Sequence, residues 1–155
     1  MPTPIHFTHN GQPVSAFADD GESLLDMLRR KLGDMTPKYG CGQGGCGACS
    51  VRINGALHLS CLTLAETVAD AEVQTLADGA GAKPCPLQQA FIDGFAAQCG
   101  YCTPGMIVAA RDLLSRNPNP SRADVIEGIS GNVCRCTGYE PIIEAILSVA
   151  QGGAR

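Results

Sequence analysis

The sequence lacks the marks of several large classes of protein. Its lysines and arginines form no basic stripe and the formal net charge is −4, so nucleic acid is not an expected partner. No apolar run reaches the roughly 18 residues that a membrane-spanning helix needs. The opening residues, MPTPIHFTHN, contain neither the basic leader nor the apolar core of a secretory signal. These absences predict a cytoplasmic protein with no membrane span of its own.

Charged residues are also scarce, at 17% of the chain, whereas hydrophobic residues make up 45%. A chain of this composition folds into a globular structure rather than staying disordered. Residues 77–86, ADGAGAKPCP, are small and rich in Gly and Pro, which indicates a linker. We therefore expect a first domain over 1–78, a linker over 79–86 and a second domain over 87–155.

The two expected domains differ in their residue patterns. In the first, Asn-Gly pairs at 10–11 and 54–55 mark two β-hairpins. Leucines spaced along 22–33 indicate one helix, and 72–76 is a candidate last strand. The second domain shows only helical patterns, which are typical of a small bundle. The predicted fold class is α+β, with helices within 86–97, 104–117, 121–131 and 140–153.

Cysteine is abundant, and nine residues is a high count for a cytoplasmic protein, where disulfides are rare. Such a count favours metal or redox chemistry. Eight of the nine fall into two groups of four. Cys85 stands between the groups, and we interpret it as a linker thiol that takes no part in either.

The first group has the plant-type 2Fe–2S spacing, Cys-x4-Cys-x2-Cys followed by a distant Cys. Its loop, KYGCGQGGCGACS, is rich in Gly, which adopts the backbone conformations that a loop converging on a cluster needs. Gly also lets peptide N–H groups approach the sulfurs and raise the reduction potential. A zinc site, which more often uses two short Cys knuckles, and disulfides remain alternatives. The predicted ligands are Cys41, Cys46, Cys49 and Cys61.

The second group consists of a Cys-x2-Cys pair and a Cys-x-Cys pair, and its spacing is less specific. Zinc or a redox-active dithiol would also suit it. Each pair precedes an expected helix that begins near a proline, Pro104 or Pro141. Helix N-termini present free N–H groups and a positive dipole end, which favours thiolates and an anionic cluster. The predicted ligands are Cys99, Cys102, Cys134 and Cys136.

Taken together, the segments GCGQGGCGAC, QCGYCTPGM and GNVCRCTGY resemble the iron–sulfur subunit of the molybdenum hydroxylases, the xanthine oxidase family. The versions CTPGM and CRCTGY resemble its xanthine dehydrogenase and carbon monoxide dehydrogenase members. The resemblance covers nearly the whole chain. It implies an N-terminal plant-ferredoxin-like β-grasp domain and a C-terminal four-helix domain, each holding one 2Fe–2S cluster.

The resemblance also implies a function. Electrons from a molybdenum–pterin centre in a large partner subunit would pass through the helical-domain cluster and then the ferredoxin-like cluster. They would leave to FAD in a medium subunit or to another acceptor. The substrate would be an N-heteroaromatic compound, a purine, an aldehyde or CO, and this chain would contain no catalytic residue. Gln98 matches a position that hydrogen-bonds the pterin, and Cys136 matches the ligand nearest to it, so we expect the helical cluster to be the more deeply buried.

Two other classes of function remain open: a free two-cluster ferredoxin and a zinc-stapled interaction module. A Rieske centre is not expected, because it needs two histidine ligands and neither cysteine loop contains a histidine. We interpret His6, His9 and His58 as surface residues, and Tyr101 and Tyr139 as packing residues.

Overall fold

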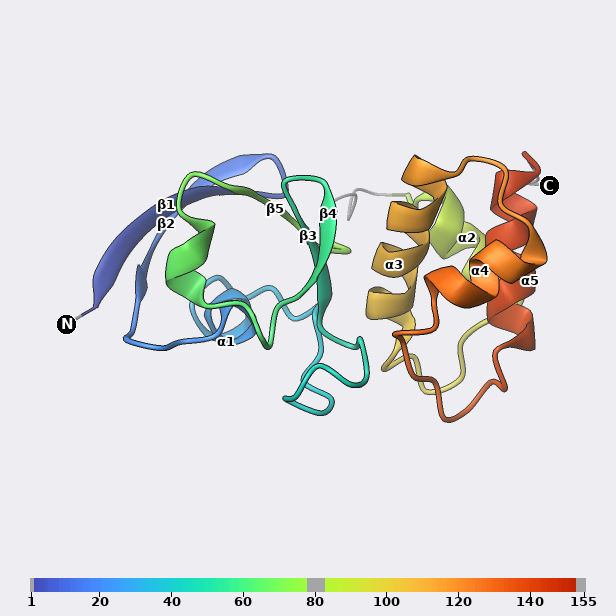
Figure 1. Ribbon diagram of the computed structural model, residues 1–155, viewed down its shortest axis with the longest axis horizontal. Coiled ribbons are helices and arrows are strands. Elements are labelled where there is room, and N and C mark those ends of the chain that lie inside the picture. Colours follow the sequence, from blue (N-terminus) through green and yellow to red (C-terminus); the bar gives the residue numbers. More distant parts are fainter. Residues whose placement is uncertain (1, 78–82, 153–155) are drawn as a thin grey trace.

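The computed structural model describes residues 2–77 and 83–152 of the chain. A β-sheet with one helix forms the N-terminal half, and a bundle of helices lies beside it as the C-terminal half (Figure 1). This arrangement confirms the predicted α+β class, with a mixed-sheet domain followed by a domain of four helices. The boundaries at 78 and 87 stay predictions, since residues 79–82 of the expected linker lie outside the described residues.

Five strands form one mixed sheet in the order β2-β1-β5-β3-β4. Both expected hairpins are present, and Asn10 and Gly11 of the first turn have φ values of 50° and 77°. Two left-handed residues in a two-residue turn match the twist of the flanking strands, which explains the Asn-Gly sequence. β5 pairs parallel to β1 and antiparallel to β3, and so joins the two hairpins. The strands are β1 (Thr3–His9), β2 (Gln12–Ala18), β3 (Ser50–Ile53), β4 (Ala56–Leu59) and β5 (Glu72–Gln74).

The helix α1 (Leu24–Arg30) packs its apolar side on the sheet. Ser23 caps it, because the Ser23 hydroxyl accepts a hydrogen bond from the backbone N–H of Asp26 at 3.1 Å. The short 3₁₀ helix η1 (Ala65–Val68) contributes to the same core. The buried side chains of this core include Ile5, Phe7, Leu24, Met27, Leu28, Val51 and Val73.

All four expected helices of the second half are present, and they enclose a separate apolar core. Pro lies in the first turn of three of them, where its missing N–H leaves no hydrogen bond unmade. The expected Ser121–Asp124 capping box begins the remaining one. The helices are α2 (Pro86–Asp93), α3 (Thr103–Arg116), α4 (Arg122–Gly128) and α5 (Glu140–Ala150). No helix in the described part of the chain is long and apolar enough to cross a membrane.

The two halves meet where α3 lies against β3 and β4 (Figure 1). Arg52 of β3 faces Asp112 of α3, with 3.8 Å between Nε and Oδ1. Gly105, in the first turn of α3, packs directly on the first cysteine loop, because a Cβ at this position would overlap the carbonyl oxygen of Gly47. This joint places the first cysteine loop next to the start of α3, at one end of the interface between the two halves (Figure 1).

Candidate metal centres

The first centre is formed by the loop ahead of β3 and by the segment that follows β4. The Cys41 thiol lies beside that of Cys46, and the backbone N–H groups of Gln43 and Gly45 donate to Cys41 Sγ at 3.5 and 3.2 Å. The Gln43 N–H, followed by the Cys46 side chain, lowers the pKa of Cys41 to about 7. Peptide donors aimed at a sulfur stabilise the thiolate form, which is the form that binds a metal.

Cys61 completes this group of four beside Cys49. Burial, and then the neighbouring Cys49 thiol, raise the pKa of Cys61 to about 11. The glycines of the loop permit its path, as expected, since Gly42, Gly44 and Gly47 all have positive φ values. The first centre thus contains two pairs of thiols, Cys41 with Cys46 and Cys49 with Cys61.

The second centre joins two distant segments at the starts of α3 and α5. Cys102 is the residue before α3, and burial followed by the neighbouring Cys134 thiol raises its pKa to about 12. Cys99 and Cys136 form the other pair, with 3.7 Å between their sulfurs. Each pair takes one cysteine from each segment, so this centre exists only when α3 and α5 pack together.

The pairing of the thiols fits a dinuclear cluster better than a zinc ion. A structural zinc ion needs four ligands around a single point, whereas four thiolates of a 2Fe–2S cluster are shared by two irons. All nine cysteines lie in the described part of the chain, and none forms a disulfide.

The two centres differ in exposure within this chain, and the expectation that the helical centre is the more deeply buried one concerns the complex and stays a prediction. Each centre has one buried cysteine, Cys49 or Cys134, but only the second centre has exposed ones, Cys99 and Cys136. The exposed pair lies in loops ahead of helix starts, at the surface of the bundle. Gln98 lies there too, and its side-chain amide donates to the carbonyl oxygen of Cys136 at 3.1 Å. The structure thus brings together the two residues predicted to face the pterin.

Hydrogen bonds connect the two centres directly. The backbone N–H of Val133, next to Cys134, donates to the carbonyl oxygen of Cys46 at 2.9 Å. The buried Asn132 amide donates to the carbonyl oxygen of Gly47, also at 2.9 Å. A Cβ on Gly47 would lie 2.5 Å from Asn132 Nδ2, so only glycine allows this approach.

The two tyrosines make hydrogen bonds that the packing interpretation did not include. The Tyr139 hydroxyl accepts the backbone N–H of Cys134 at 2.9 Å. The Tyr101 hydroxyl donates across the interface to the carbonyl oxygen of Tyr39 at 2.7 Å. Tyr139 also packs against the core of the bundle, whereas the Tyr101 side chain is largely exposed.

The interpretation of His9 as a surface residue is wrong. Its side chain is only 13% exposed, and its Nε2 lies 3.0 Å from Oδ2 of the buried Asp34. Burial alone would raise the pKa of Asp34, but hydrogen bonds from His9, Thr75 and Thr36 outweigh it and hold that pKa well below its usual range. Asp34 thereby ties the segment ahead of the first cysteine loop to the ends of β1 and β5. His6 and His58 are exposed, as expected.

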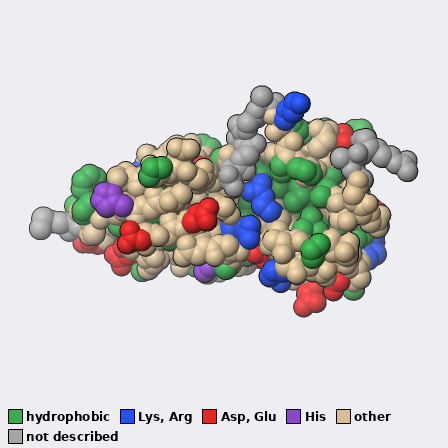
Figure 2. Space-filling model, turned by 90° about the horizontal axis from the view of Figure 1, so that it is seen from above, with side chains coloured by type: hydrophobic (Ala, Val, Ile, Leu, Met, Phe, Trp, Pro, Cys, Tyr) green, Lys and Arg blue, Asp and Glu red, His purple; other side chains and the backbone are tan. Residues whose placement is uncertain are grey.

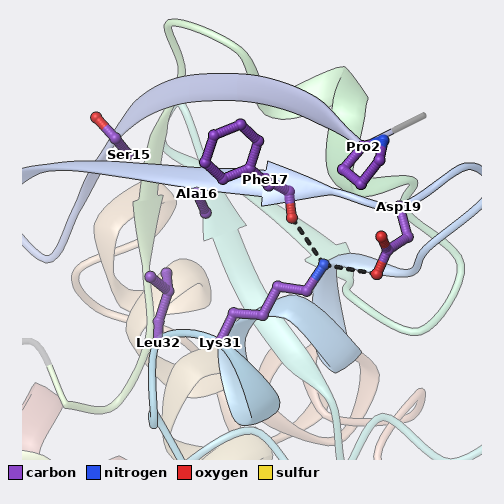
Figure 3. A pocket seen from close by; sticks show the side chains of 7 residues that line it. All are labelled: Pro2, Ser15, Ala16, Phe17, Asp19, Lys31 and Leu32. Carbon is purple, nitrogen blue, oxygen red and sulfur yellow. Dashed lines mark hydrogen bonds and ion pairs between the residues drawn. The ribbon is translucent and has the colours of Figure 1, made fainter.

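Neither the charged side chains nor the hollow between β2 and α1 suggests a second site. Figure 2 shows acidic side chains on both halves and several basic ones near their junction. Figure 3 shows the hollow, where Lys31 donates to Asp19 and to the carbonyl oxygen of Phe17. A further ion pair to Glu22 engages the same ammonium group, so its charge is already neutralised within the chain.

Comparisons with known proteins identify both halves. A family model described as a 2Fe-2S iron-sulfur cluster binding domain matches residues 7–77, and one described as a [2Fe-2S] binding domain matches residues 73–147. The predicted cofactors of this chain, two 2Fe–2S clusters, are thereby confirmed.

Full-length relatives agree with these matches. The nicotinate dehydrogenase small FeS subunit of Eubacterium barkeri is 43% identical over 92% of this chain and 91% of its own. The nicotine 6-hydroxylase small subunit of Paenarthrobacter nicotinovorans is 44% identical over 89% of this chain and 84% of its own. Among solved structures, quinoline 2-oxidoreductase from Pseudomonas putida 86 matches with a TM-score of 0.93 and 42% identity, covering 98% of both chains. The chain belongs to the small 2Fe–2S subunits of the molybdenum hydroxylases, in the xanthine dehydrogenase family.

Proposed function

We propose that this iron–sulfur subunit carries electrons from a molybdenum–pterin centre in a large partner subunit to FAD in a medium subunit, or to another acceptor. The eight paired cysteines hold the two clusters: Cys41, Cys46, Cys49 and Cys61 the first, and Cys99, Cys102, Cys134 and Cys136 the second. When bound, each cluster supplies a site that takes up and releases one electron. The chain contributes position, hydrogen bonding and partner contacts, and no catalytic residue.

The observation that carries this proposal is the hydrogen bond between the Val133 N–H and the Cys46 carbonyl group. Cys46 belongs to the first group of ligands, and Val133 is covalently joined to Cys134 of the second. One hydrogen bond and a few covalent bonds therefore connect the ligands of the two centres. The close approach at Gly47 and Gly105 keeps the connection between the two centres short.

The exposed end of the bundle supports an electron entry point there. Cys99, Cys136 and Gln98 are all exposed in the chain on its own, and they lie together. The Gln98 amide nitrogen already donates to the Cys136 carbonyl oxygen, and we assign its amide oxygen to accept a hydrogen bond from a pterin. We assign this face to the large molybdenum-binding partner, and the first cysteine loop to the acceptor side.

The substrate that we propose for the complex is an N-heteroaromatic compound, ahead of a purine, an aldehyde or CO. The names of the three relatives described above refer to nicotine, nicotinate and quinoline, each of which contains a nitrogen heterocycle. The pocket that distinguishes these substrates belongs to the large subunit. A cytoplasmic location completes the proposal and rests on the richness in free cysteine.

Stopped-flow reduction of the complete complex by its substrate tests the order of transfer. We expect a Cys136→Ala complex to bind substrate but fail to reduce the first cluster. A Cys46→Ala complex should still reduce the helical cluster and fail to reduce the final acceptor. The opposite pattern, with the Cys136→Ala complex passing electrons on and the Cys46→Ala complex leaving the helical cluster oxidised, would show that the order is reversed.

A further inference from the structure

A closed set of hydrogen bonds surrounds Cys134 in the turn that leads into α5. The backbone N–H of Tyr139 donates to Oγ1 of Thr137 at 3.2 Å. The same Oγ1 lies 3.2 Å from Cys134 Sγ. The Tyr139 hydroxyl in turn accepts the Cys134 N–H at 2.9 Å. The three residues thus hold one another through both side-chain and backbone groups.

The direction of the Thr137–Cys134 hydrogen bond follows from the chemistry of its two ends. A cysteine that binds iron is a thiolate, which has no proton and can only accept. The Thr137 oxygen already accepts the Tyr139 N–H, which directs its own proton elsewhere. The hydroxyl proton is therefore the one that lies between Oγ1 and Sγ, and the bond is a charge-assisted one.

The backbone of this turn has an uncommon conformation, in which the Thr137 hydroxyl faces the Cys134 sulfur. Gly138 and Tyr139 have φ values of 68° and 70°, so two successive residues are left-handed. For Tyr139 this conformation is unfavourable unless other contacts hold it. Its N–H bond to Thr137 and its hydroxyl bond from Cys134 supply those contacts.

Among the hydrogen bonds described for the sulfurs of the first centre, none comes from a side-chain hydroxyl. Cys41 Sγ receives the backbone N–H groups of Gln43 and Gly45, which are present whatever the side chains are. Cys134 Sγ receives a side-chain hydroxyl in addition to the backbone N–H groups of Cys136 and Thr137. The hydroxyl is therefore the donor at Cys134 that a single substitution can remove while the backbone donors stay.

We propose that Thr137 is a positioning residue for the helical-domain cluster. Its hydroxyl donates a hydrogen bond to the Cys134 sulfur and thereby sets the reduction potential of that cluster. The proposal rests on the assignment of Cys134 as a ligand. Reduction adds negative charge to a cluster, and a donor to a ligand sulfur stabilises that charge, so the potential rises. Thr137 thereby makes the helical cluster a better acceptor of electrons from its partner.

The test compares Thr137→Val, which has nearly the same shape without the hydroxyl, with Thr137→Ser, which retains it. Both are made in the complete complex, and each cluster's midpoint potential is measured by redox titration followed by electron paramagnetic resonance. We expect Thr137→Val to lower the reduction potential of the helical cluster. The equilibrium constant for sharing one electron between the two clusters should change by up to tenfold, which corresponds to about 59 mV. Thr137→Ser should retain the wild-type value, and the ferredoxin-like cluster should be unchanged in both variants.

Three results would overturn the proposal. One is an unchanged potential in Thr137→Val accompanied by lower stability, which would make Thr137 a turn-forming residue only. Another is an equal change in Thr137→Ser. The third is failure of both Thr137→Val and the smaller Thr137→Ala to bind the helical cluster, because a group that only tunes potential is not needed for assembly. Failure of the ligand assignment is recognised separately, since Cys134→Ser would then leave the helical cluster's signal intact.

Discussion

The two cysteine centres of this protein are built in different ways. The first draws three of its four cysteines from one glycine-rich loop, and backbone N–H groups surround the Cys41 sulfur. The second joins cysteines from two segments more than thirty residues apart in the sequence, and a threonine hydroxyl serves one of its sulfurs. Local sequence largely shapes the first centre, whereas the packing of two helices assembles the second.

The difference in exposure follows from this difference in construction. The end of the first loop is covered by the second half of the chain, where Gly105 of α3 and Asn132, ahead of α5, contact Gly47. The second centre lies at the end of a bundle, where Cys99 and Cys136 remain exposed. A centre at the exposed end of the bundle can contact a partner chain. A centre at the interface between the two halves lies next to the other centre of the same chain.

The strongest way to break the comparison is to remove one ligand from each centre. Cys46→Ala should abolish only the ferredoxin-like cluster, and Cys102→Ala only the helical one, because no cysteine is shared. Two 2Fe–2S clusters contain about four irons, so each variant should retain about half of the iron bound by this chain. Iron analysis and electron paramagnetic resonance of the anaerobically purified complex measure this. Stoichiometric zinc in the wild type, or loss of both signals in either variant, would contradict it.

The joint between the centres is tested by Gly47→Ala. The new Cβ would lie 2.5 Å from Asn132 Nδ2, and the residue would have to keep a φ of 68°. Overlap and left-handed strain together should cost about 2–4 kcal/mol, and electron transfer between the clusters should slow. Urea unfolding and stopped-flow kinetics measure the two effects.

Gly45→Ala is the matched control for Gly47→Ala. It lies in the same loop, no atom lies within 4 Å of its added Cβ, and it keeps the N–H that donates to Cys41. We expect both clusters and the transfer rate to be unaffected. An equal loss in the two variants would mean that the loop tolerates no side chain, rather than that the joint requires close approach.

The buried polar group that supports the first centre is tested by Asp34→Asn. Asparagine replaces one carboxylate oxygen by an NH₂ group, which donates instead of accepting. In one orientation this group faces the donors of Thr36, and in the other it faces those of His9 and Thr75. Losing hydrogen bonds to a charged group should destabilise the N-terminal half by about 2 kcal/mol. Asp19→Asn, at a more exposed ion pair with Lys31, should cost less than about 1 kcal/mol.

The effect of Asp34 should also depend on pH in a defined direction. Its pKa in the folded protein is lowered, so the stability it contributes is fully present above its unfolded pKa of about 3.9. That stability is lost as the pH falls through the lower, folded-state pKa. The difference between wild type and Asp34→Asn should therefore be constant between pH 7 and pH 5 and shrink below about pH 4. A difference that grows on acidification in urea titrations would contradict this account.

The smallest effect is expected for Cys85→Ser, outside both centres. Cys85 caps α2, its sulfur accepting a backbone N–H of the first turn. A serine hydroxyl makes the better cap, while the partly buried sulfur loses some packing, so stability should change by less than about 0.5 kcal/mol. Both cluster signals should persist. Loss of either signal would show that the grouping of ligands is wrong.

Features set by short stretches of sequence were predicted correctly. The Asn-Gly turns require two left-handed residues, and prolines pre-form helix starts, so both hairpins and all four helices of the second half could be located. The His9–Asp34–Thr75 network could not, because its members are 25 and 41 residues apart and meet only when the sheet forms. The parallel pairing of β1 with β5 could not be predicted from the sequence for the same reason.

The Thr137 hydroxyl was missed although its motif was visible. The sequence CRCTGY places a threonine three residues after a ligand and directly before a glycine, which suits a tight turn. That pattern indicates where the threonine lies but not which group its hydroxyl faces. The left-handed Tyr139 decides that, and a tyrosine gives no local signal for such a conformation.

The contact between Asn132 and Gly47 has a consequence for how the chain folds. The two residues are 85 positions apart, whereas each hairpin and helix closes over a few residues. Closing a long loop costs chain entropy that short-range contacts avoid, so distant contacts form late. The N-terminal half can thus reach its final shape while the C-terminal half is still being synthesised, and the joint closes only when GNVCRCTGY has docked. Pulsed hydrogen exchange during refolding should therefore show the Val133 amide protected after the amides of β3 and α3.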